Sequence, residues 1–525
     1  MNKHLTSSIY SFEDLINGNF LYVDKTEFVW KLLKPSKELY FLSRPRRFGK
    51  SLLLSTLKAI FEGKRELFKG LALAGKPYEW KIHPVIHLDM NGRDFRTVAK
   101  MEESFKSIIR EQADMNKVAL TETSPEGMFH ELIKTLHDNS GDVVLLLDEY
   151  DKPILNNIAK ENRYDFLEAL KVFYSVIKEK ASMLRLAFIT GVSKFSHVSI
   201  FSDLNNLTDI TLKPEYADML GFTEAEIRQY FADRIPLAAK TNGCSEEELM
   251  RTLLTWYDGY RFSDEETHVC NPVSLSSFFS NNYKFTNYWD STGTPSFLLK
   301  VARESDYDYE AALTRFYSES IFSAYELDRL DITGLLWQTG YLTIKEVRTD
   351  TDGLQYRLDF PDKEVQETFS RKLIEFLVGS VKGDEASYLA HEFRAAIRKD
   401  DLNGFMTLFQ SFLATISYDI HHPHEKYYQT IFFIVFKLLG ASIEAESRTN
   451  EGRIDAYIRT AKKIYIFEFK LNKKLVKAVS QIMDRHYYER FQACGQPIVM
   501  VGVNFNSKKG RIDNWAETTL AARIS

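Results

Sequence analysis

Hydrophobic and polar positions along the chain fall into three successive patterns. In the first, from Glu38 to about Leu212, short apolar runs alternate with longer helical stretches. The runs are LYFLS (39–43), PVIHLDM (84–90), VVLLLDEY (143–150), LRLAFITGV (184–192) and NNLTDITL (205–212). Continuous apolar strands separated by helices are typical of a parallel sheet that is covered on both faces. The first pattern therefore predicts an α/β domain.

The second and third patterns predict two further regions. From about Lys213 to Asp400 amphipathic helices dominate, and residues 327–365 predict a helix followed by two short strands, which indicates a winged-helix-like unit. From about Phe405 the pattern predicts a long apolar helix, three strands, a second helix and a further strand. The long helix is predicted at 425–440, and the three strands at about 441–447, 453–459 and 463–470. The second helix begins at about Lys474, and the last strand is at 497–505. We therefore expect three domains, at 1–212, 213–400 and 401–525.

Composition and charge narrow the function classes. With 525 residues, 44% of them hydrophobic, the chain is long enough for several ordered cores. The formal net charge of -5 excludes a protein that coats DNA by bulk electrostatics, so contact with nucleic acid would need a local basic groove.

The cysteines and the apolar runs indicate the cellular compartment of the protein. Cys244, Cys270 and Cys494 are far apart and form no CxxC pair, which argues against a zinc site and fits a reducing cytoplasm. The N-terminal residues contain no apolar leader, and no apolar run is long enough for a membrane span. We expect a cytoplasmic protein without a membrane partner.

A strand, a loop and a helix follow one another in the order that a phosphate-binding loop requires. LYFLS runs into RPRRFGKS and then into LLLSTLKAIF. Backbone N–H groups of such a loop face phosphate oxygens, where the helix dipole favours negative charge. Lys50 would reach the β- and γ-phosphates of ATP, Ser51 would hold Mg²⁺, and Gly49 permits a close backbone approach. The predicted nucleotide-binding residues are Arg47, Phe48, Gly49, Lys50, Ser51, Leu52, Asp148 and Thr190.

A second acidic motif follows the strand VVLLLDEYD. Asp148 would bind Mg²⁺, directly or through water, and Glu149 would polarise the water that attacks the γ-phosphate. Thr190, at the end of the strand 184–192, is a candidate for sensing the γ-phosphate. A solvated strand end or a helix cap is the alternative for Asp148, Glu149 and Asp151, and a cap of the next turn is the alternative for Thr190. A helix N-terminus without a ligand is the alternative for Lys50 and Ser51.

Three arginines in this loop have no single predicted role. Arg44 stands where the motif GxxxxGK[ST] has its first glycine. Arg44, Arg46 and Arg47 could each contact phosphates, pair with acids or lie on a surface between domains, and the sequence does not choose among these roles.

Five segments together resemble the AAA-ATPase-like family of bacteria and some archaea, whose P-loop also reads RPRRFGKS. They are SFEDLINGNFLYVDKTEFVWKLL, RPRRFGKSLLLSTL, PVIHLDM, LLLDEYDKPI and ITGVSKFS. The resemblance covers about residues 5–290 and implies that Arg44 is a variation of the family itself. It also makes Tyr22, Asp24 and Lys25 a family hallmark, which we expect to support the nucleotide pocket from the N-terminal segment.

A second constellation lies near the C-terminus. GRIDAYI and KKIYIFEFK predict two antiparallel strands, with Asp455 on the first and with Glu468 and Lys470 on one face of the second. Asp455 and Glu468, with the backbone carbonyl of Phe469, would hold Mg²⁺ or Mn²⁺ for phosphodiester hydrolysis. Lys470 would orient the attacking water or help to deprotonate it. The alternative is a surface ion pair between Glu468 and Lys470, worth under about 1 kcal/mol.

This constellation resembles the PD-(D/E)XK nuclease superfamily. The matching residues are Glu425, which would complete the metal shell, Asp455, Glu468, Lys470 and Gln481. Ile454 replaces the usual proline before the aspartate. The resemblance implies an α/β restriction-endonuclease-like fold from about 405 to 515. Three histidines at 421, 422 and 424 are expected to cap or support the loop and not to bind a metal.

We therefore predict an ATP-binding and ATP-hydrolysing protein with an Mg²⁺-dependent nuclease domain that acts on nucleic acid, on DNA in preference to RNA. Basic residues near the second site could contact phosphates or form a solvated helix face; they are Lys470, Lys473, Lys474, Lys477, Arg485 and Arg490. An alternative is an ATP-dependent switch or scaffold whose C-terminal domain binds nucleic acid or a protein without cutting. A third is an ATPase with an inert passenger domain. An oligomer is compatible with each of these.

Overall fold

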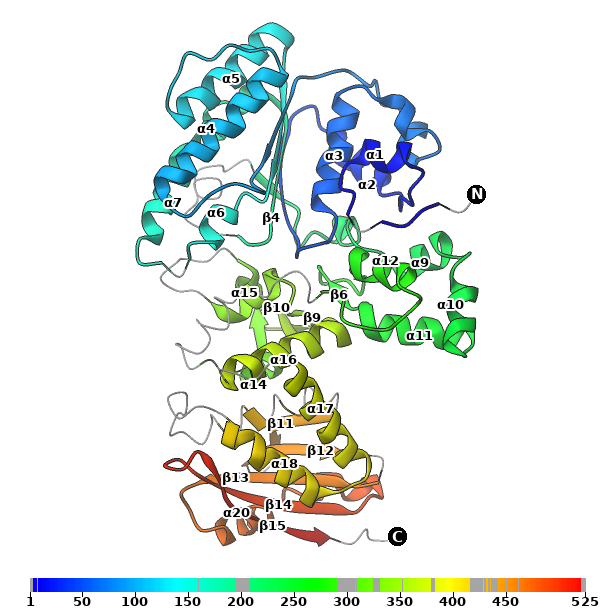
Figure 1. The fold of residues 1–525 in the computed structure, drawn as a ribbon, viewed down its shortest axis with the longest axis vertical. Coiled ribbons are helices and arrows are strands. Elements are labelled where there is room, and N and C mark those ends of the chain that lie inside the picture. Colours follow the sequence, from blue (N-terminus) through cyan, green and yellow to red (C-terminus); the bar gives the residue numbers. More distant parts are fainter. Residues whose placement is uncertain are drawn as a thin grey trace. The chain divides into compact units, whose positions relative to one another are not determined.

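The computed structural model forms two compact units (Figure 1). The first comprises Met1–Ala302 and Phe316–Asp362, and the second comprises Arg303–Arg315 and Lys363–Ser525. The structure describes residues 3–6, 8–158, 160–194, 207–289, 307, 309–323, 331–351, 353–378, 383–415, 428, 431–432, 435, 442–449, 452–460 and 462–520. In this part of the chain no helix combines the length and the apolar character needed to cross a bilayer.

The first unit is built on a five-stranded parallel sheet with the strand order β2-β3-β4-β1-β5. Its strands are β1 (Glu38–Ser43), β2 (Val85–Asp89), β3 (Val143–Asp148), β4 (Leu184–Gly191) and β5 (Leu207–Asp209). All six residues of β3 are buried, as a central strand covered on both faces requires. The five strands lie within the predicted apolar runs, so the predicted α/β class is confirmed.

Helices cover both faces of this sheet, with α1, α2 and α3 on one side and α4, α5 and α7 on the other (Figure 1). Their bounds are α1 (Phe12–Asn17), α2 (Thr26–Leu33), α3 (Lys50–Phe61), α4 (Val98–Met115), α5 (Pro125–Ser140), α6 (Lys152–Leu155) and α7 (Arg163–Glu179). The side chains of Thr97 and Ser124 accept backbone N–H groups in the first turns of α4 and α5. These caps mark the points where the two helices begin.

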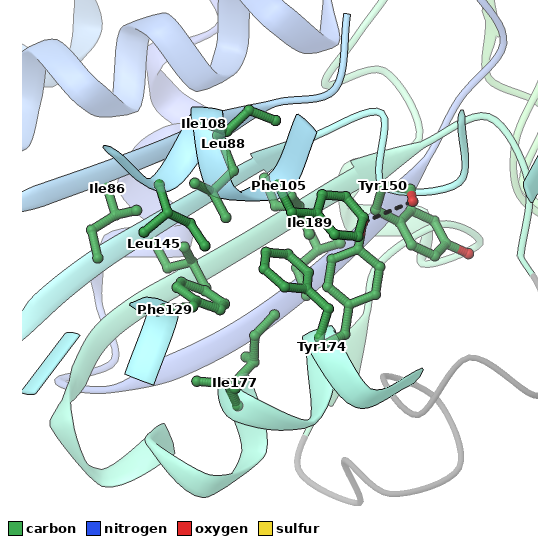
Figure 2. Packing of buried hydrophobic residues seen from close by; sticks show 14 of the residues in the cluster. Ile86, Leu88, Phe105, Ile108, Phe129, Leu145, Tyr150, Tyr174, Ile177 and Ile189 are labelled. Atoms are coloured by element: carbon green, nitrogen blue, oxygen red, sulfur yellow. Dashed lines mark hydrogen bonds between the residues drawn. The ribbon is translucent and has the colours of Figure 1, made fainter. Parts of the chain in front are cut away.

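The core under α4, α5 and α7 combines aliphatic side chains with a group of aromatic rings (Figure 2). Phe105 of α4 and Phe129 of α5 both stack on Phe173 of α7, with ring centroids 4.2 and 5.2 Å apart.

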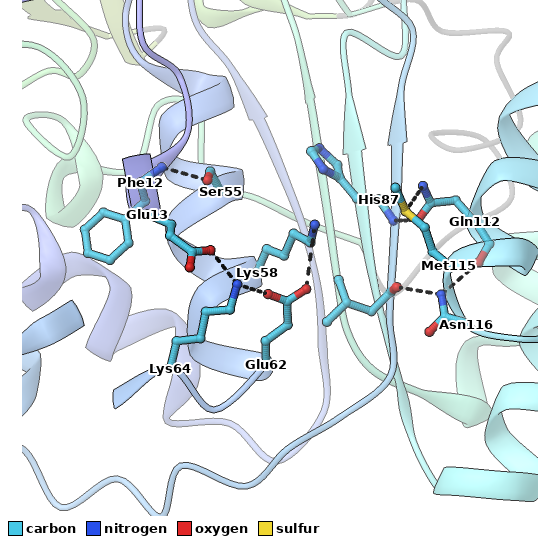
Figure 3. A network of polar contacts seen from close by, with 11 residues as sticks. Phe12, Glu13, Ser55, Lys58, Glu62, Lys64, His87, Gln112, Met115 and Asn116 are labelled. Carbon is cyan, nitrogen blue, oxygen red and sulfur yellow. Dashed lines mark hydrogen bonds and ion pairs between the residues drawn. The ribbon is translucent and has the colours of Figure 1, made fainter. Parts of the chain in front are cut away.

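On the opposite face of the sheet, polar contacts join α1 to α3 and to the residues that follow α3 (Figure 3). The Phe12 amide donates to Ser55 Oγ at 2.8 Å, and Lys64 pairs with Glu13 at 2.5 Å.

A helical group and a small sheet complete the first unit. The group contains α9 (Glu224–Tyr230), α10 (Ile235–Asn242), α11 (Glu246–Tyr257), β6 (Tyr260–Arg261), β7 (His268–Val269) and α12 (Pro272–Ser280). Capping boxes at Thr223 and Ser245 begin α9 and α11. The small sheet has the order β8-β10-β9, and α15 (Ile332–Gln338) lies between β8 and β9 in the chain. Its strands are β8 (Phe316–Ser318), β9 (Thr343–Asp350) and β10 (Gly353–Asp359).

The helix and two strands predicted at 327–365 are therefore present, and β8 adds a third strand that was not predicted. Short 3-10 helices connect elements throughout the first unit. They are η1 (Arg65–Phe68), η2 (Ala72–Gly75), η3 (Ala181–Met183), η4 (Pro214–Tyr216) and η6 (Glu319–Phe322).

The second unit contains a mixed sheet with the order β11-β12-β13-β14-β15. Its strands are β11 (Ser442–Thr449), β12 (Gly452–Arg459), β13 (Ile464–Leu471), β14 (Ile498–Asn506) and β15 (Arg511–Leu520). Only the central pair, β13 and β14, is parallel among these neighbours. The helical elements are α14 (Tyr309–Thr314), α16 (Lys363–Val378), α17 (Gly383–Arg398), α18 (Leu402–Thr415), α20 (Val476–Asp484) and η8 (Glu489–Cys494).

The predicted helix at 425–440 is described at four positions only, all of them helical and buried: Tyr428, Ile431, Phe432 and Val435. Their spacing of three and four residues puts them on one helix face. Phe432 packs against Phe467 of β13, with ring centroids 4.8 Å apart. Phe432 therefore lies against one face of the second sheet.

Candidate functional site

The loop of residues 44–49 joins β1 to α3 and borders a cavity of about 560 Å³. Gly49 has φ +94° and Arg47 has φ +68°, so the loop takes the left-handed backbone conformation twice. That conformation is strained for most residues and unstrained for glycine. The cavity is lined on this side by Arg46, Arg47, Phe48, Gly49, Lys50, Ser51 and Leu52. The predicted nucleotide-binding residues of the loop thus all face one space at the N-terminus of α3.

Lys50 lies at the floor of this space. Its ammonium group donates to the carbonyls of Arg44 at 2.9 Å and Pro45 at 3.1 Å, and the residue is 5% exposed. Burial lowers the pKa of Lys50, and the nearby carboxylates of Glu149 and Asp148 oppose that shift. A phosphate in the cavity would offer this ammonium group a charged acceptor, which binds more strongly than two neutral carbonyls.

Asp148 gathers two hydroxyl groups at the carboxyl edge of the sheet. Ser51 donates to its Oδ2 at 2.5 Å and Thr190 donates to its Oδ1 at 2.7 Å. Asp148 is 1% exposed and Thr190 is fully buried. The structure thus brings together three predicted residues from α3, β3 and β4. A serine hydroxyl beside a carboxylate is a set of hard oxygen donors that suits Mg²⁺.

Glu149 follows Asp148 and also lines the cavity. Its backbone has φ +52°, an uncommon conformation for a residue other than glycine. Its carboxylate pairs with Lys152 at 3.3 Å, and Lys152 also donates to the side chain of Asn91. A carboxylate at this place can accept a proton from a water molecule in the cavity.

Asp151, the third acid of the motif, does not line the cavity. It is 1% exposed and accepts hydrogen bonds from the Ser193 amide at 2.7 Å and the Ser193 hydroxyl at 2.6 Å. Burial raises the pKa of Asp151. This residue therefore ties the segment after β4 to the segment after β3.

Arg44 has a structural role that the sequence did not indicate. Its guanidinium group donates to the carbonyls of Ser43, Thr211 and Tyr216 at 2.9, 2.7 and 3.2 Å. It also lies 4.1 Å from the ring centroid of Phe262, and burial lowers its pKa to about 9. Arg44 thus holds the start of the loop against the segment after β5 and leaves the cavity to its neighbours.

The segment containing Tyr22, Asp24 and Lys25 connects the cavity to the helical group. Tyr22 and Lys25 line the cavity. The Lys25 ammonium donates to the Asp218 carbonyl at 2.7 Å and pairs with Glu226 of α9 at 2.6 Å. Asp24 accepts the amide of Ala72 at 2.7 Å, which anchors the segment from the other side.

The remaining cavity wall is mainly apolar and was not predicted. Residues from the N-terminal segment, from the segment just before α9 and from α12 contribute to it. They are Thr6, Ile9, Tyr10, Leu15, Leu21, Val23, Met219, Leu220, Gly221, Phe222, Pro272, Val273 and Ser276. The cavity therefore has a charged end at the loop and an apolar end, as a nucleotide with its phosphates and base requires.

The second predicted site lies where β12 separates from β13. The Asp455 carboxylate accepts the Phe469 amide at 2.7 Å, just beyond the last ladder pair of these strands, Ala456 with Phe467. Glu468 and Lys470 form an ion pair at 2.6 Å and are 1% and 8% exposed. The structure therefore brings these three predicted residues to one end of β13.

Successive side chains along β13 point to opposite faces of the sheet. Ile464 and Ile466 share a face with Glu468 and pack in one cluster with Ile482 of α20. Phe469 faces the other way and packs against Phe432, with ring centroids 4.7 Å apart. The acid and the lysine thus lie on the α20 side of the sheet, beyond its apolar cluster.

Gln481 and Glu425 are the other two residues predicted for this site. Gln481 is half-buried on α20, directly before Ile482. Glu425 and the three histidines at 421, 422 and 424 lie outside the described residues. Within the described ranges, no three histidine, cysteine or acidic side chains are grouped so that they could hold a metal ion. The metal ligands of this site therefore stay a prediction.

Comparison with known proteins identifies both regions. Residues 7–201 match the family described as "Predicted AAA-ATPase", and residues 423–515 match the PD-(D/E)XK nuclease superfamily. An uncharacterized protein in the vnfD 5' region of Azotobacter chroococcum mcd 1 is 34% identical over 517 residues, which cover 96% of each chain. The two resemblances predicted from the sequence are confirmed.

Solved structures are also similar, at low TM-scores. The Aeropyrum pernix ORC1 protein in complex with DNA is 12% identical, with a TM-score of 0.24 over 66% of this chain and 91% of that chain. Cdc6p from Pyrobaculum aerophilum is 12% identical, with a TM-score of 0.22 over 71% and 97%. The Aeropyrum pernix ORC2 protein is 11% identical, with a TM-score of 0.25 over 69% and 93%.

Proposed function

Because the chain belongs to the AAA-ATPase-like family and carries a domain of the PD-(D/E)XK nuclease superfamily, we propose that it hydrolyses ATP at one site and cuts nucleic acid at the other. The observation that carries the proposal of ATP hydrolysis is the cluster of Ser51, Thr190 and Asp148 beside the buried Lys50. DNA is the proposed nucleic acid. The three free cysteines fit a cytoplasmic protein.

At the nucleotide site we assign a role in phosphate binding, metal binding or hydrolysis to each residue. Lys50 binds the β- and γ-phosphates, and backbone N–H groups of the loop and of α3 bind phosphate oxygens. Ser51 and Asp148 would hold Mg²⁺, which neutralises charge on the phosphates when it is bound. Glu149 orients and polarises the attacking water, and Thr190 positions Asp148 and senses the γ-phosphate.

Substitutions at Lys50 and Glu149 test the ATPase. We expect Lys50→Ala to lose ATP binding in calorimetry. Glu149→Gln should keep binding while phosphate release falls by roughly 10²-fold or more, since it removes only the group that polarises water. Lys58→Ala, which changes a partly exposed lysine on the same helix, is the matched control. ATP binding by Lys50→Ala at wild-type affinity would disprove this assignment.

At the second site Asp455 and Glu468 would hold Mg²⁺ or Mn²⁺, with Glu425 as a further ligand and Gln481 as a supporting residue. Lys470 orients the attacking water or removes its proton, and the bound metal would stabilise the charge that develops on the phosphate. The ion pair of Glu468 with Lys470 supports this proposal because it places a cation beside a metal-binding carboxylate. The Phe469 amide, in turn, fixes the orientation of Asp455.

The same contacts also favour a second candidate function, an ATP-dependent switch whose C-terminal domain binds nucleic acid or a protein without cutting. Asp455 already accepts a backbone amide and Glu468 already pairs with a lysine, as in a purely structural network. Soaking crystals with Mn²⁺ separates the two functions. The nuclease requires an ordered ion between Asp455 and Glu468, whereas the switch does not.

A further inference from the structure

Two loops of the second unit meet at the carboxyl end of the parallel pair β13 and β14. Residues 472–474 follow β13, and residues 506–511 join β14 to β15. Because parallel strands end at the same edge of a sheet, both loops emerge beside the end of β13 that carries Glu468 and Lys470. Glu468 pairs in register with Gly502, only four residues before the second loop begins, or roughly 13 Å along the strand.

Direct hydrogen bonds hold the two loops together. The Asn472 side chain donates to Ser507 Oγ at 2.7 Å and accepts the Ser507 amide at 3.1 Å. The Asn472 amide donates to the Phe505 carbonyl at 2.8 Å. Within the second loop, Asn506 Oδ1 accepts the amides of Lys508 and Lys509, both at 3.1 Å. The backbone of this surface is therefore fixed before any partner binds.

The two loops present five exposed cations, which we call the basic rim: Lys473, Lys474, Lys508, Lys509 and Arg511. Within the described part of the chain, none of the five forms an ion pair. This differs from lysines elsewhere, such as Lys58, Lys64 and Lys76, which pair with glutamates. Unpaired cations on a chain of net charge -5 create a local positive potential for an anionic partner.

We propose that the basic rim binds the phosphate backbone of duplex DNA and sets the register of the duplex on the site at Glu468 and Lys470. Lysine and arginine contacts to phosphate position a protein on a duplex without reading its sequence. Neither loop contains an aromatic residue. Binding of single strands relies on aromatic side chains that stack on bases, so this surface fits a duplex backbone better. This inference rests on the proposed nuclease function and adds the surface that holds its substrate.

Salt dependence of binding tests the basic rim. Each phosphate contact contributes about 0.9 to the slope of log affinity against log salt concentration for duplex DNA. Binding of a labelled duplex to the full chain would be followed by fluorescence anisotropy between about 50 and 200 mM salt, with EDTA present so that no metal contributes. We expect the double variant Lys508→Ala/Lys509→Ala to bind more weakly and to reduce the slope by about 2.

The matched control is Lys462→Ala/Lys463→Ala. These lysines are also adjacent in a turn, but the turn precedes β13 and so lies at the opposite end of the strand. The control should leave both affinity and slope unchanged. Equal effects of the two double variants would overturn the proposal, and so would tighter binding of a single strand or a poly-glutamate peptide than of the duplex.

Cleavage assays separate this inference from the proposed function. If the wild type cuts DNA in a manner that Asp455→Ala abolishes, while the rim variant binds duplex like the control, only the basic rim is disproved. If the wild type binds no duplex at any salt concentration, the rim is disproved, and the cleavage assay shows whether the nuclease proposal fails with it.

Discussion

At the scale of single residues, Asp258 is a carboxylate in an unfavourable place. It follows α11, and Cys270 Sγ lies 3.7 Å from its Oδ1. Burial raises the pKa of Asp258 from its usual 3.8 to about 6, and a hydrogen bond from the Gly259 amide opposes that shift only in part. The folded protein therefore binds a proton at Asp258 more tightly than the unfolded chain does. Stability consequently falls as pH rises from about 4 to 6.

Asp258→Asn should remove this destabilisation. At pH 8 we expect the variant to have a free energy of unfolding higher than that of the wild type by up to about 3 kcal/mol. The advantage should shrink as the pH falls through about 6 towards 4, because the wild-type carboxyl group then becomes neutral as well. Urea denaturation at several pH values measures it, with the exposed Asp264→Asn as control. An advantage that does not change with pH would contradict the explanation.

Arg44→Gly would restore the first glycine of the common P-loop motif, yet we expect it to weaken ATP binding. The substitution removes the three hydrogen bonds of the guanidinium group and its contact with Phe262. Buried carbonyls left without donors cost roughly 1 to 3 kcal/mol each, so the loop should lose its fixed position. Calorimetry with ATP and a thermal melt measure the effect. ATP affinity equal to or above that of the wild type would contradict this role.

The sequence could predict some site residues because strand ends determine their positions. Asp148 and Thr190 lie at the ends of apolar strands, and Ser51 follows the loop after a third strand. Parallel strands bring such ends together. By contrast, Arg44 contacts a carbonyl 167 residues away, and Lys25 pairs with a glutamate 201 residues away. No local pattern carries such information, so these contacts became visible only in the structure.

At the scale of elements, the pair of Lys25 with Glu226 joins the N-terminal segment to α9. Their side chains are 10% and 19% exposed. Lys25→Met should lower the free energy of unfolding by about 3 kcal/mol, because it leaves Glu226 without its buried cation. We expect weaker ATP binding as well, because Lys25 itself lines the cavity.

A double-mutant cycle in urea isolates this contact. Adding Glu226→Gln to Lys25→Met should restore part of the lost stability, because no buried charge then lacks a partner. The neutral glutamine side chain introduced by Glu226→Gln can still accept the Thr223 amide in the capping box of α9. Additive losses from the two substitutions would show that the pair does not couple the segment to α9.

Strands built from long apolar runs were predicted well, whereas the edge strands β8 and β15 were not predicted. β1, β3 and β4 of the first sheet are mostly apolar runs, and β13 is buried at seven of its eight positions. β15 was missed because it lies at the sheet edge and only Ile512 is buried along it. Its sequence RIDNWAETTL lacks the alternation of apolar and polar residues that indicates a strand. Its stability derives from pairing with β14, which is non-local.

At the scale of the whole molecule, one chain combines the proposed nucleotide site in its first unit with an acid and lysine site in its second. The proposed function assigns ATP hydrolysis to the first unit and DNA cleavage to the second. Its central claim is that Asp455 and Glu468 act in cleavage and not only in folding.

Cleavage of labelled duplex DNA with Mg²⁺ or Mn²⁺, with and without ATP, tests this claim most directly. We expect the wild type to cut, Asp455→Ala to lose cutting while it still hydrolyses ATP, and Lys50→Ala to lose only the response to ATP. Retained ATP hydrolysis shows that the first unit of Asp455→Ala is folded, and retained binding of duplex DNA would show the same for the second unit. Cutting by Asp455→Ala at the wild-type rate, or no metal-dependent cutting by the wild type on any DNA, would contradict the account.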